Sequence, residues 1–233
     1  MYKIDIKNLD CFEFLKEVED QSVDLVLIDP PYEISRTTGF SSVVNGVERF
    51  AVSMDFGEWD YDFAGLDIAI KEFYRVAKTG ATVIIFYDLW KITPLAKMLE
   101  KAGFKQLRFI EWIKTNPVPL NSKVNYLTNS REIAVTAVKG SKPKFHSKYD
   151  NGIYEYPIYQ GKDRCHPTQK PLKLFEELIR KHSNEGDIVL DCFLGSGTTA
   201  IASKNTNRNF IGCELDEKYY QKALERVKKS NKI

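Results

Sequence analysis

Hydrophobic residues repeat along this chain with two different periods, and stretches of the two kinds alternate. Short, nearly continuous apolar runs are typical of strands buried on both faces, whereas apolar side chains three and four positions apart indicate amphipathic helices. The predicted strands span residues 3–7, 23–28, 81–87, 106–113, 132–138, 186–190 and 209–214. The predicted helices span residues 11–20, 62–78, 90–102 and 166–183, with two more after residues 199 and 214. This alternation is that of an open α/β sheet.

The strand at residues 23–28 ends abruptly at Asp29-Pro30-Pro31-Tyr32. Proline has no N–H to donate and a fixed φ, so the two prolines make a stiff turn directly after Asp29. A carboxylate, two proline carbonyls and an aromatic ring are thereby held at the carboxyl end of a strand, where open α/β sheets bind ligands. The carboxylate and a carbonyl can accept both hydrogens of an exocyclic base amine, and the Tyr ring can stack on a base that has left its duplex. A proline-stiffened turn without a chemical role is the alternative.

A second turn, after the strand at residues 186–190, carries Asp191 and two glycines, Gly195 and Gly197. Glycine allows backbone N–H groups to approach a ligand at the mouth of the following helix. Glu214 ends the next strand, near the ~20-residue offset at which an acid meets ribose hydroxyls in dinucleotide folds. Gly195-x-Gly197-x-x-Ala200 also satisfies a loose NAD pattern, so a nicotinamide oxidoreductase is the competing interpretation. That interpretation leaves residues 29–32 without a role.

Composition describes an ordinary globular protein and does not by itself indicate a partner. Of the 233 residues, 43% are hydrophobic and 28% are charged, and the formal net charge is +2. This length suits one domain spanning residues 1–233. No apolar run approaches the ~18 residues of a membrane span, and the first residues do not resemble a signal peptide. Four cysteines without paired spacing and only three histidines predict reduced thiols, a cytoplasmic protein and no metal site.

Two stretches show no clear periodicity. Residues 33–60 are rich in Ser, Thr, Gly and Asn, and we expect so long a loop to be a mobile loop over the active site. Residues 139–165 interleave basic and aromatic side chains, which suit phosphates and bases respectively, so we expect a target-recognition insertion. Its candidate nucleic-acid ligands are Lys142, Lys144 and Lys148. An irregular, solvated insertion is the alternative.

Three motifs of the chain resemble those of one enzyme family. Asp29-Pro30-Pro31-Tyr32 resembles the catalytic motif of the amino-methyltransferases that act on adenine or cytosine in DNA. Asp-Cys-Phe-Leu-Gly-Ser-Gly-Thr-Thr at residues 191–199 resembles their S-adenosylmethionine loop, and His-Pro-Thr-Gln-Lys-Pro at 166–171 resembles the segment beside the methionine end of that cofactor. The catalytic motif comes first, as in the circularly permuted β class, and the chain is most similar to small adenine-specific members of restriction-modification systems.

The resemblance implies a single circularly permuted domain with the Rossmann-like fold of S-adenosylmethionine-dependent methyltransferases. Its sheet would have seven strands, mostly parallel with the last pair antiparallel, helices on both faces and a small target-recognition region inserted. The strands that end at Asp29 and Asp191 would open into one crevice, because methyl donor and target base must meet.

The resemblance also assigns roles to individual residues. The catalytic residues it implies are Asp29, Pro30, Pro31 and Tyr32. The cofactor-binding residues it implies are Asp10, Cys11, Asp29, Thr168, Gln169, Lys170, Asp191, Phe193, Gly195, Ser196, Gly197, Thr198, Thr199 and Glu214. Asp10 is equally well explained as a helix N-cap, and Lys170 as a solvated lysine at a helix start.

The implied reaction is methyl transfer from S-adenosylmethionine to the 6-amino group of adenine in double-stranded DNA, after base flipping. Asp rather than Ser at the first motif position is more typical of adenine enzymes, and N4-cytosine methylation is the alternative. No residue separates DNA from RNA as the substrate. A homodimer, a cognate restriction endonuclease and a second methyltransferase stay open as partners.

Overall fold

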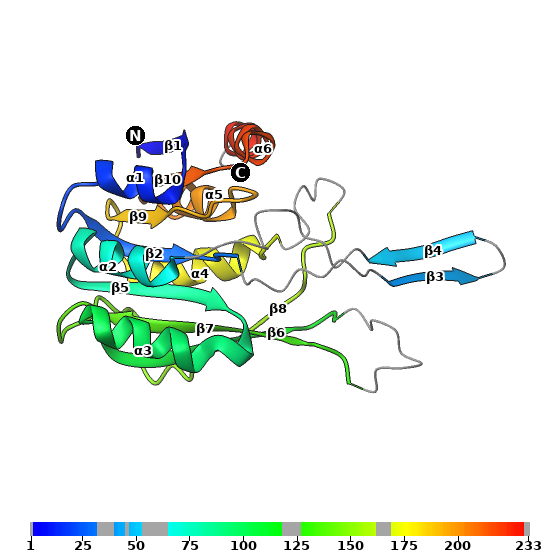
Figure 1. The fold of residues 1–233 in the computed structure, drawn as a ribbon, viewed down its shortest axis with the longest axis horizontal. Coiled ribbons are helices and arrows are strands. Elements are labelled where there is room, and N and C mark those ends of the chain that lie inside the picture. Colours follow the sequence, from blue (N-terminus) through cyan, green and yellow to red (C-terminus); the bar gives the residue numbers. More distant parts are fainter. Residues whose placement is uncertain are drawn as a thin grey trace.

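Eight strands form one sheet within the residues that the computed structural model describes, which are 2–31, 40–44, 47–52, 65–117, 127–161 and 169–230. The strand order is β1-β10-β9-β2-β5-β7-β6-β8 (Figure 1). The strands are β1 (Ile4–Asn8), β2 (Val23–Ile28), β5 (Ala77–Tyr87), β6 (Lys105–Lys114), β7 (Arg131–Val138), β8 (Ile153–Tyr156), β9 (Ile188–Asp191) and β10 (Asn209–Glu214). The predicted α/β class is therefore confirmed.

Strand β7 runs antiparallel to both of its neighbours, β5 and β6, while the other pairs in the sheet are parallel. The predicted strand number is one too low, because β8 adds to the outer edge of the sheet beside β6. This strand belongs to the stretch 139–165 that we expected to be an insertion. Part of that stretch is therefore continuous with the main sheet.

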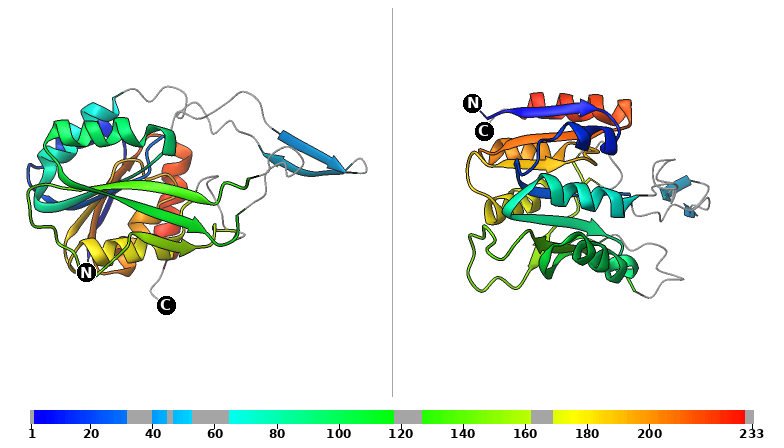
Figure 2. Two further views of the ribbon diagram at one scale, coloured as in Figure 1. Left: turned by 90° about the horizontal axis from the view of Figure 1, so that it is seen from below. Right: turned by 60° about the vertical axis from the view of Figure 1, so that its left-hand side comes forward.

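Helices cover both faces of the sheet (Figure 2), as predicted. The helices are α1 (Cys11–Glu17), α2 (Leu66–Val76), α3 (Ile92–Ala102), α4 (Leu172–His182), α5 (Thr198–Asn205) and α6 (Glu217–Lys229), with a short 3₁₀ turn η2 (Leu89–Lys91). Side chains alternate between the faces of a strand. In β2, Val26 and Ile28 therefore pack with α1, α2 and α3, whereas Leu25 and Leu27 pack with α4 and α5. All six β2 residues are buried, which explains why the strand is apolar except at Asp24.

Strands that are far apart in the sequence pair with one another in the sheet. Leu25 and Val26 of β2 pair in parallel with Val189 and Leu190 of β9, and β1 pairs in parallel with β10. The carboxyl ends of these strands consequently share one edge of the sheet, which we call the carboxyl edge. Between β10 and β9 the backbones approach so closely that a Cβ atom on Gly212 would lie 2.2 Å from the Asp191 carbonyl oxygen.

A two-stranded antiparallel hairpin, β3 (Phe40–Val44) and β4 (Val47–Val52), lies within the stretch 33–60, where the sequence showed no periodicity. In Figure 1 it lies beyond the carboxyl ends of β2 and β5. The rest of that stretch is outside the described residues, and its role as a loop over the active site stays a prediction.

Candidate active site

Three carboxylates mark the carboxyl edge. Asp29 directly follows β2, Asp191 is the last residue of β9, and Glu214 is the last residue of β10. Pro30 and Pro31 are buried behind Asp29. Parallel pairing of β2 with β9 and of β9 with β10 brings these positions, predicted from separate motifs, to the same edge. Tyr32 and Thr168, also predicted for this site, lie outside the described residues.

Lys170 lies between two acidic side chains at this edge. Its ammonium group forms an ion pair with Oδ2 of Asp29 and lies 3.1 Å from Oε2 of Glu132, on β7. Oε1 of Glu132 is in turn 2.8 Å from Nζ of Lys114, the last residue of β6. Lys170 is only 5% exposed. The residue immediately before it, Gln169, is also buried. Lys170 is therefore not the solvated lysine of the alternative interpretation.

The charges of Lys170 and Glu132 are each stabilised by the oppositely charged groups beside them, despite their burial. Burial alone would lower the pKa of Lys170, but Asp29 and Glu132 outweigh it and raise that pKa above its usual value. Burial would likewise raise the pKa of Glu132, but Lys170 and Lys114 outweigh it and lower that pKa. Both residues consequently carry their charges at neutral pH.

Asp191 shapes the glycine-rich turn from within. Its carboxylate accepts hydrogen bonds from the Thr199 hydroxyl at 2.5 Å and from the Phe193 backbone N–H at 2.9 Å. Burial raises the pKa of Asp191 to about 7, and the nearby charges of Asp29 and Glu214 add to this. A carboxyl group that titrates near neutrality in a ligand-binding edge is typical of functional sites.

Glu214 binds the same turn from the neighbouring strand. Its Oε2 accepts a hydrogen bond from the Gly195 N–H at 2.7 Å and its Oε1 accepts one from the Asp216 N–H at 2.9 Å. Burial raises the pKa of Glu214. Gly197 caps α5 with φ of +80°, a left-handed conformation that favours glycine. The buried hydroxyls of Ser196 and Thr198 lie 3.1 Å apart beside it.

Asp10 and Cys11 begin helix α1. The Asp10 carboxylate accepts hydrogen bonds from the N–H groups of Phe12 at 2.8 Å and Glu13 at 3.4 Å. These contacts are those of the N-cap interpretation, and the cofactor role of Asp10 stays a prediction. Cys11 is buried, and burial raises the pKa of its thiol to about 12. Cys11 can therefore contribute only as a small apolar side chain near neutral pH.

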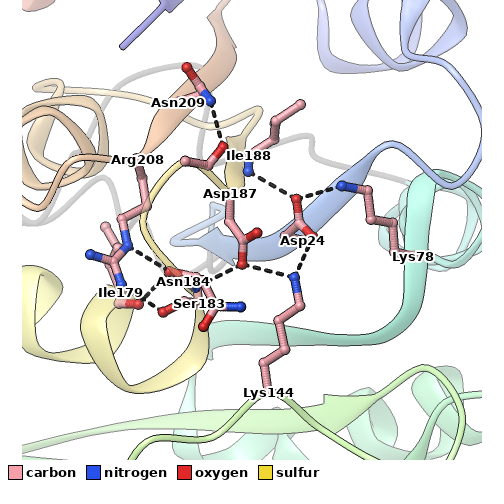
Figure 3. A network of polar contacts seen from close by, with 11 residues as sticks. Asp24, Lys78, Lys144, Ile179, Ser183, Asn184, Asp187, Ile188, Arg208 and Asn209 are labelled. Atoms are coloured by element: carbon pink, nitrogen blue, oxygen red, sulfur yellow. Dashed lines mark hydrogen bonds and ion pairs between the residues drawn. The ribbon is translucent and has the colours of Figure 1, made fainter. Parts of the chain in front are cut away.

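Lys144 does not reach the carboxyl edge. Its ammonium group lies 2.7 Å from Oδ1 of Asp24 and 2.9 Å from Oδ2 of Asp187 (Figure 3). Asp24 is the second residue of β2 and is 1% exposed, and it also pairs with Lys78 at 2.8 Å. Since Asp29 follows the other end of β2, the structure places Lys144 at the opposite edge of the sheet, where it neutralises a buried acid.

The neighbours of Lys144 in the chain follow it to that opposite edge. The Lys144 N–H donates to the Gly80 carbonyl at 3.3 Å, and the Lys142 carbonyl oxygen also lies close to Gly80, near the start of β5. Lys142 and Lys148 have exposed side chains. Lys144 is therefore bound to two acids at that opposite edge, and the nucleic-acid-binding role of Lys142, Lys144 and Lys148 stays a prediction.

Glu132 is a site residue that the sequence analysis did not single out. It lies at the start of β7, a strand that was predicted correctly, whereas Lys114 follows the predicted strand 106–113 and extends β6 by one residue. The available signal for Glu132 was an acidic residue beside an otherwise mostly apolar strand, at the end nearest the carboxyl edge. In the described parts of the chain, no group of His, Cys, Asp and Glu side chains is arranged to hold a metal ion. None of the helices described there is long and apolar enough to cross a membrane.

Comparison with known proteins gives the family. A family of N6 and N4 methyltransferases, described as DNA methylase, matches residues 23–225. The chain belongs to this DNA methylase family. It is 33% identical to the type II methyltransferase M2.DpnII of Streptococcus pneumoniae, over 98% of this chain and 91% of that protein. It is 30% identical to the type II methyltransferase M.HinfI of Haemophilus influenzae, over 94% of this chain and 67% of that protein.

Solved structures agree with this DNA methylase assignment. The crystal structure of the M1.HpyAVI–SAM complex matches with a TM-score of 0.74 and 30% identity, covering 96% of this chain and 98% of that one. The cytosine-N4-specific PvuII DNA methyltransferase matches with a TM-score of 0.76 over 99% of this chain and 88% of that one. At 17% identity the second likeness concerns the fold alone.

Proposed function

We propose that the carboxyl edge with Asp29, Asp191 and Glu214 is the active site, where this DNA methylase transfers a methyl group from S-adenosylmethionine to the 6-amino group of adenine in DNA. The observation that carries the proposal is the parallel pairing of β2 with β9, which brings the turn after Asp29 beside the glycine-rich turn after Asp191. Relatives of this chain are type II methyltransferases, and the similar protein M1.HpyAVI was solved as a complex with S-adenosylmethionine (SAM).

The residues of the edge fit this cofactor chemically. S-adenosylmethionine carries a sulfonium cation and two ribose hydroxyls, and the edge offers the carboxylates of Asp29, Asp191 and Glu214. Glu214 would accept hydrogen bonds from the ribose hydroxyls. The hydroxyls of Ser196 and Thr198 would contact the methionine end, together with Thr168, Gln169, Lys170 and Thr199. Asp10, Cys11 and Phe193 would border the adenine ring. When bound, the cofactor supplies an electrophilic methyl group.

Asp29 acts on the target amine. The lone pair of an exocyclic amine is delocalised into the base, so the amine is a poor nucleophile. Hydrogen bonds from the amine to the Asp29 carboxylate and the Pro30 carbonyl favour a pyramidal nitrogen with a localised lone pair. Catalysis then depends on holding this nitrogen at a near-attack distance of ~3–3.5 Å from the methyl carbon. Tyr32 would stack on the flipped base.

The DNA faces the carboxyl edge rather than the segment around Lys144. The hairpin β3–β4 lies beyond this edge (Figure 1). Trp90, which follows the carboxyl end of β5, is 89% exposed, and Leu127, which precedes β7, is 72% exposed. Exposed aromatic and apolar side chains beside a base-flipping site are suited to stacking on bases. A cognate restriction endonuclease is the protein partner that fits the type II relatives, and a homodimer stays a prediction.

A product assay tests this function. The protein is incubated with plasmid DNA and S-adenosylmethionine carrying a labelled methyl group, and the DNA is digested to nucleosides and separated. We expect labelled 6-methyladenine. Labelled 4-methylcytosine alone would reassign the target base while leaving the site in place. DNA without label, from a folded protein that binds the cofactor, would reject the proposal.

A further inference from the structure

Asp29, Lys170, Glu132 and Lys114 form a row of alternating charges along the carboxyl edge; we call it the charge row. Its members come from the end of β2, the segment before α4, the start of β7 and the end of β6. From this geometry we infer that Glu132 is a positioning residue that acts through Lys170 on Asp29. The inference rests on the proposed function.

Lys170 is the most buried member of the charge row. Its side chain is 5% exposed, whereas the side chains of Lys114, Asp29 and Glu132 are 13%, 20% and 22% exposed. The Lys170 ammonium also lies 5.6 Å from the centre of the Phe86 ring, and the Lys114 ammonium lies 5.3 Å from that of Trp112. Aromatic faces attract cations electrostatically, so both ammonium groups are held in place from more than one side.

A buried row of charges is weak evidence for a stabilising role. Removing charges from water costs more than a buried ion pair commonly regains, and well-packed apolar residues of similar size are often at least as stabilising. The first member of the charge row is Asp29, whose carboxylate accepts a hydrogen bond from the target amine in the proposed reaction. Clusters of mutually perturbed charges in such places are typical of functional sites.

The order of the charges suits methyl transfer. Positive charge develops on the amine nitrogen as the methyl group arrives, and the negative charge of Asp29 stabilises it. Lys170 alone would fix the Asp29 carboxylate but would also cancel that charge. Glu132, on the other side of Lys170, shares the ammonium group, so the three groups together keep one net negative charge beside the amine. Lys114 balances Glu132 at the far end, further from the reaction.

The first measurement is turnover of Glu132→Gln, which keeps the size of the side chain and removes its charge. We expect kcat to fall at least tenfold, while the KM values for DNA and cofactor stay within twofold of the wild type. Glu111→Gln is the matched control, because the Glu111 side chain is similarly exposed, lies on β6 and pairs with the exposed Arg131 at 3.2 Å. Its kcat should be that of the wild type. Wild-type kcat in a folded Glu132→Gln protein would overturn the inference.

The second measurement is the pKa of Asp29, followed by NMR with carbon-13-labelled aspartate and assigned by the loss of its signal in Asp29→Asn. Among the described residues, the charged groups near Asp29 include Lys170, Glu132 behind it, and Asp191 from β9. Lys170→Met should raise this pKa, because a cation is lost. Glu132→Gln should lower it, because Lys170 is no longer shared. If Glu132 had a purely structural role, the Asp29 pKa would shift in the same direction in both variants. That result would refute the inference.

This titration needs no turnover, so it is independent of the product assay that tests the proposed function. Should Glu132→Gln fail to fold, Glu132→Asp replaces it in both measurements. The shorter side chain keeps the charge but withdraws it from Lys170, so we expect kcat to fall three- to tenfold and the Asp29 pKa to decrease. Wild-type values for both quantities in Glu132→Asp would overturn the inference.

Discussion

Nζ of Lys144 lies 2.7 Å from Oδ1 of Asp24, although 120 positions separate the two residues in the sequence. This pair fastens the segment after β7 to the amino end of β2. It also explains how Asp24 remains ionised inside the sheet. Burial would raise the pKa of Asp24, but Lys144 and Lys78 outweigh it and lower that pKa.

Replacing Lys144 by Ala should therefore cost stability and leave DNA binding unchanged. The buried Asp24 would lose a charged hydrogen-bond partner, so we expect the free energy of unfolding to fall by about 1.5–3 kcal/mol. Urea denaturation measures this, with the exposed Lys142→Ala as the control that should stay near wild type. If the salt dependence of DNA affinity flattens in Lys144→Ala, Lys144 contacts phosphate after all.

Glu214→Ala should weaken S-adenosylmethionine binding. Loss of hydrogen bonds to a charged group predicts a decrease of about 1.5–3 kcal/mol in binding free energy, measurable by calorimetry. Glu217→Ala, an exposed acid in the first turn of α6, serves as the control. Unchanged affinity in a folded Glu214→Ala protein would remove Glu214 from the cofactor site.

Asp29→Ala should nearly abolish methyl transfer while the protein keeps its fold and much of its cofactor affinity, because the target amine loses its acceptor. Tyr32→Phe should be mild, since stacking needs the ring and not the hydroxyl. Tyr32→Ala should lose about 1–3 kcal/mol of stacking with the base. Single-turnover methylation assays measure all three variants, and robust turnover by Asp29→Ala would disprove the role of the carboxylate.

Asp191 predicts a pH dependence of stability. Its pKa is raised to about 7 in the folded protein, so folding favours its protonated form. The contribution of protonated Asp191 to the free energy of unfolding is fully present below the unfolded pKa of about 3.9 and is lost as pH rises through 7. Asp191→Asn cannot ionise, so its stability relative to the wild type should increase between pH 4 and pH 8. Thermal unfolding across this range tests the sign, and a constant difference would contradict it.

Trp90 provides a test of the DNA-facing edge. Since it is 89% exposed, its replacement by Ala should leave the melting temperature within a few degrees of wild type. DNA affinity should fall by about 1–3 kcal/mol if its ring stacks on a base. Phe109→Ala is the control, because Phe109 is 61% exposed on β6 away from the strand end. Equal DNA affinities for both variants and the wild type would place the DNA elsewhere.

The elements that the sequence predicted well are those whose burial leaves a periodic signature. Strand β2 is buried on both faces and α3 ends at Gly103, in a left-handed conformation, as its sequence indicated. Strand β8 was missed because it has four residues at the sheet edge, and only Tyr154 among them is fully buried. The hairpin β3–β4 was missed although Asn45-Gly46 lies between its strands, a dipeptide that commonly joins hairpins.

Residues at the carboxyl edge could be predicted when a motif placed them at the end of a strand, as with Asp29 and Asp191. Partners of charged side chains could not be predicted in this way. Nothing in the sequence around Lys144 or Lys170 identifies its partner, yet each pairs with an acid more than 100 positions away. Which acid each one meets is decided by the packing of the sheet.

Pairing of β2 with β9 and of β1 with β10 also governs when the protein can fold during its synthesis. β1 and β2 are made well before these partners, because Ile4 pairs with Phe210 and Leu25 pairs with Val189. Contacts so distant in sequence slow folding, and the apolar β2 stays without a neighbour on one side until β9 emerges. Until β9 is made, β2 therefore exposes an unpaired apolar strand edge, a surface that is prone to aggregate.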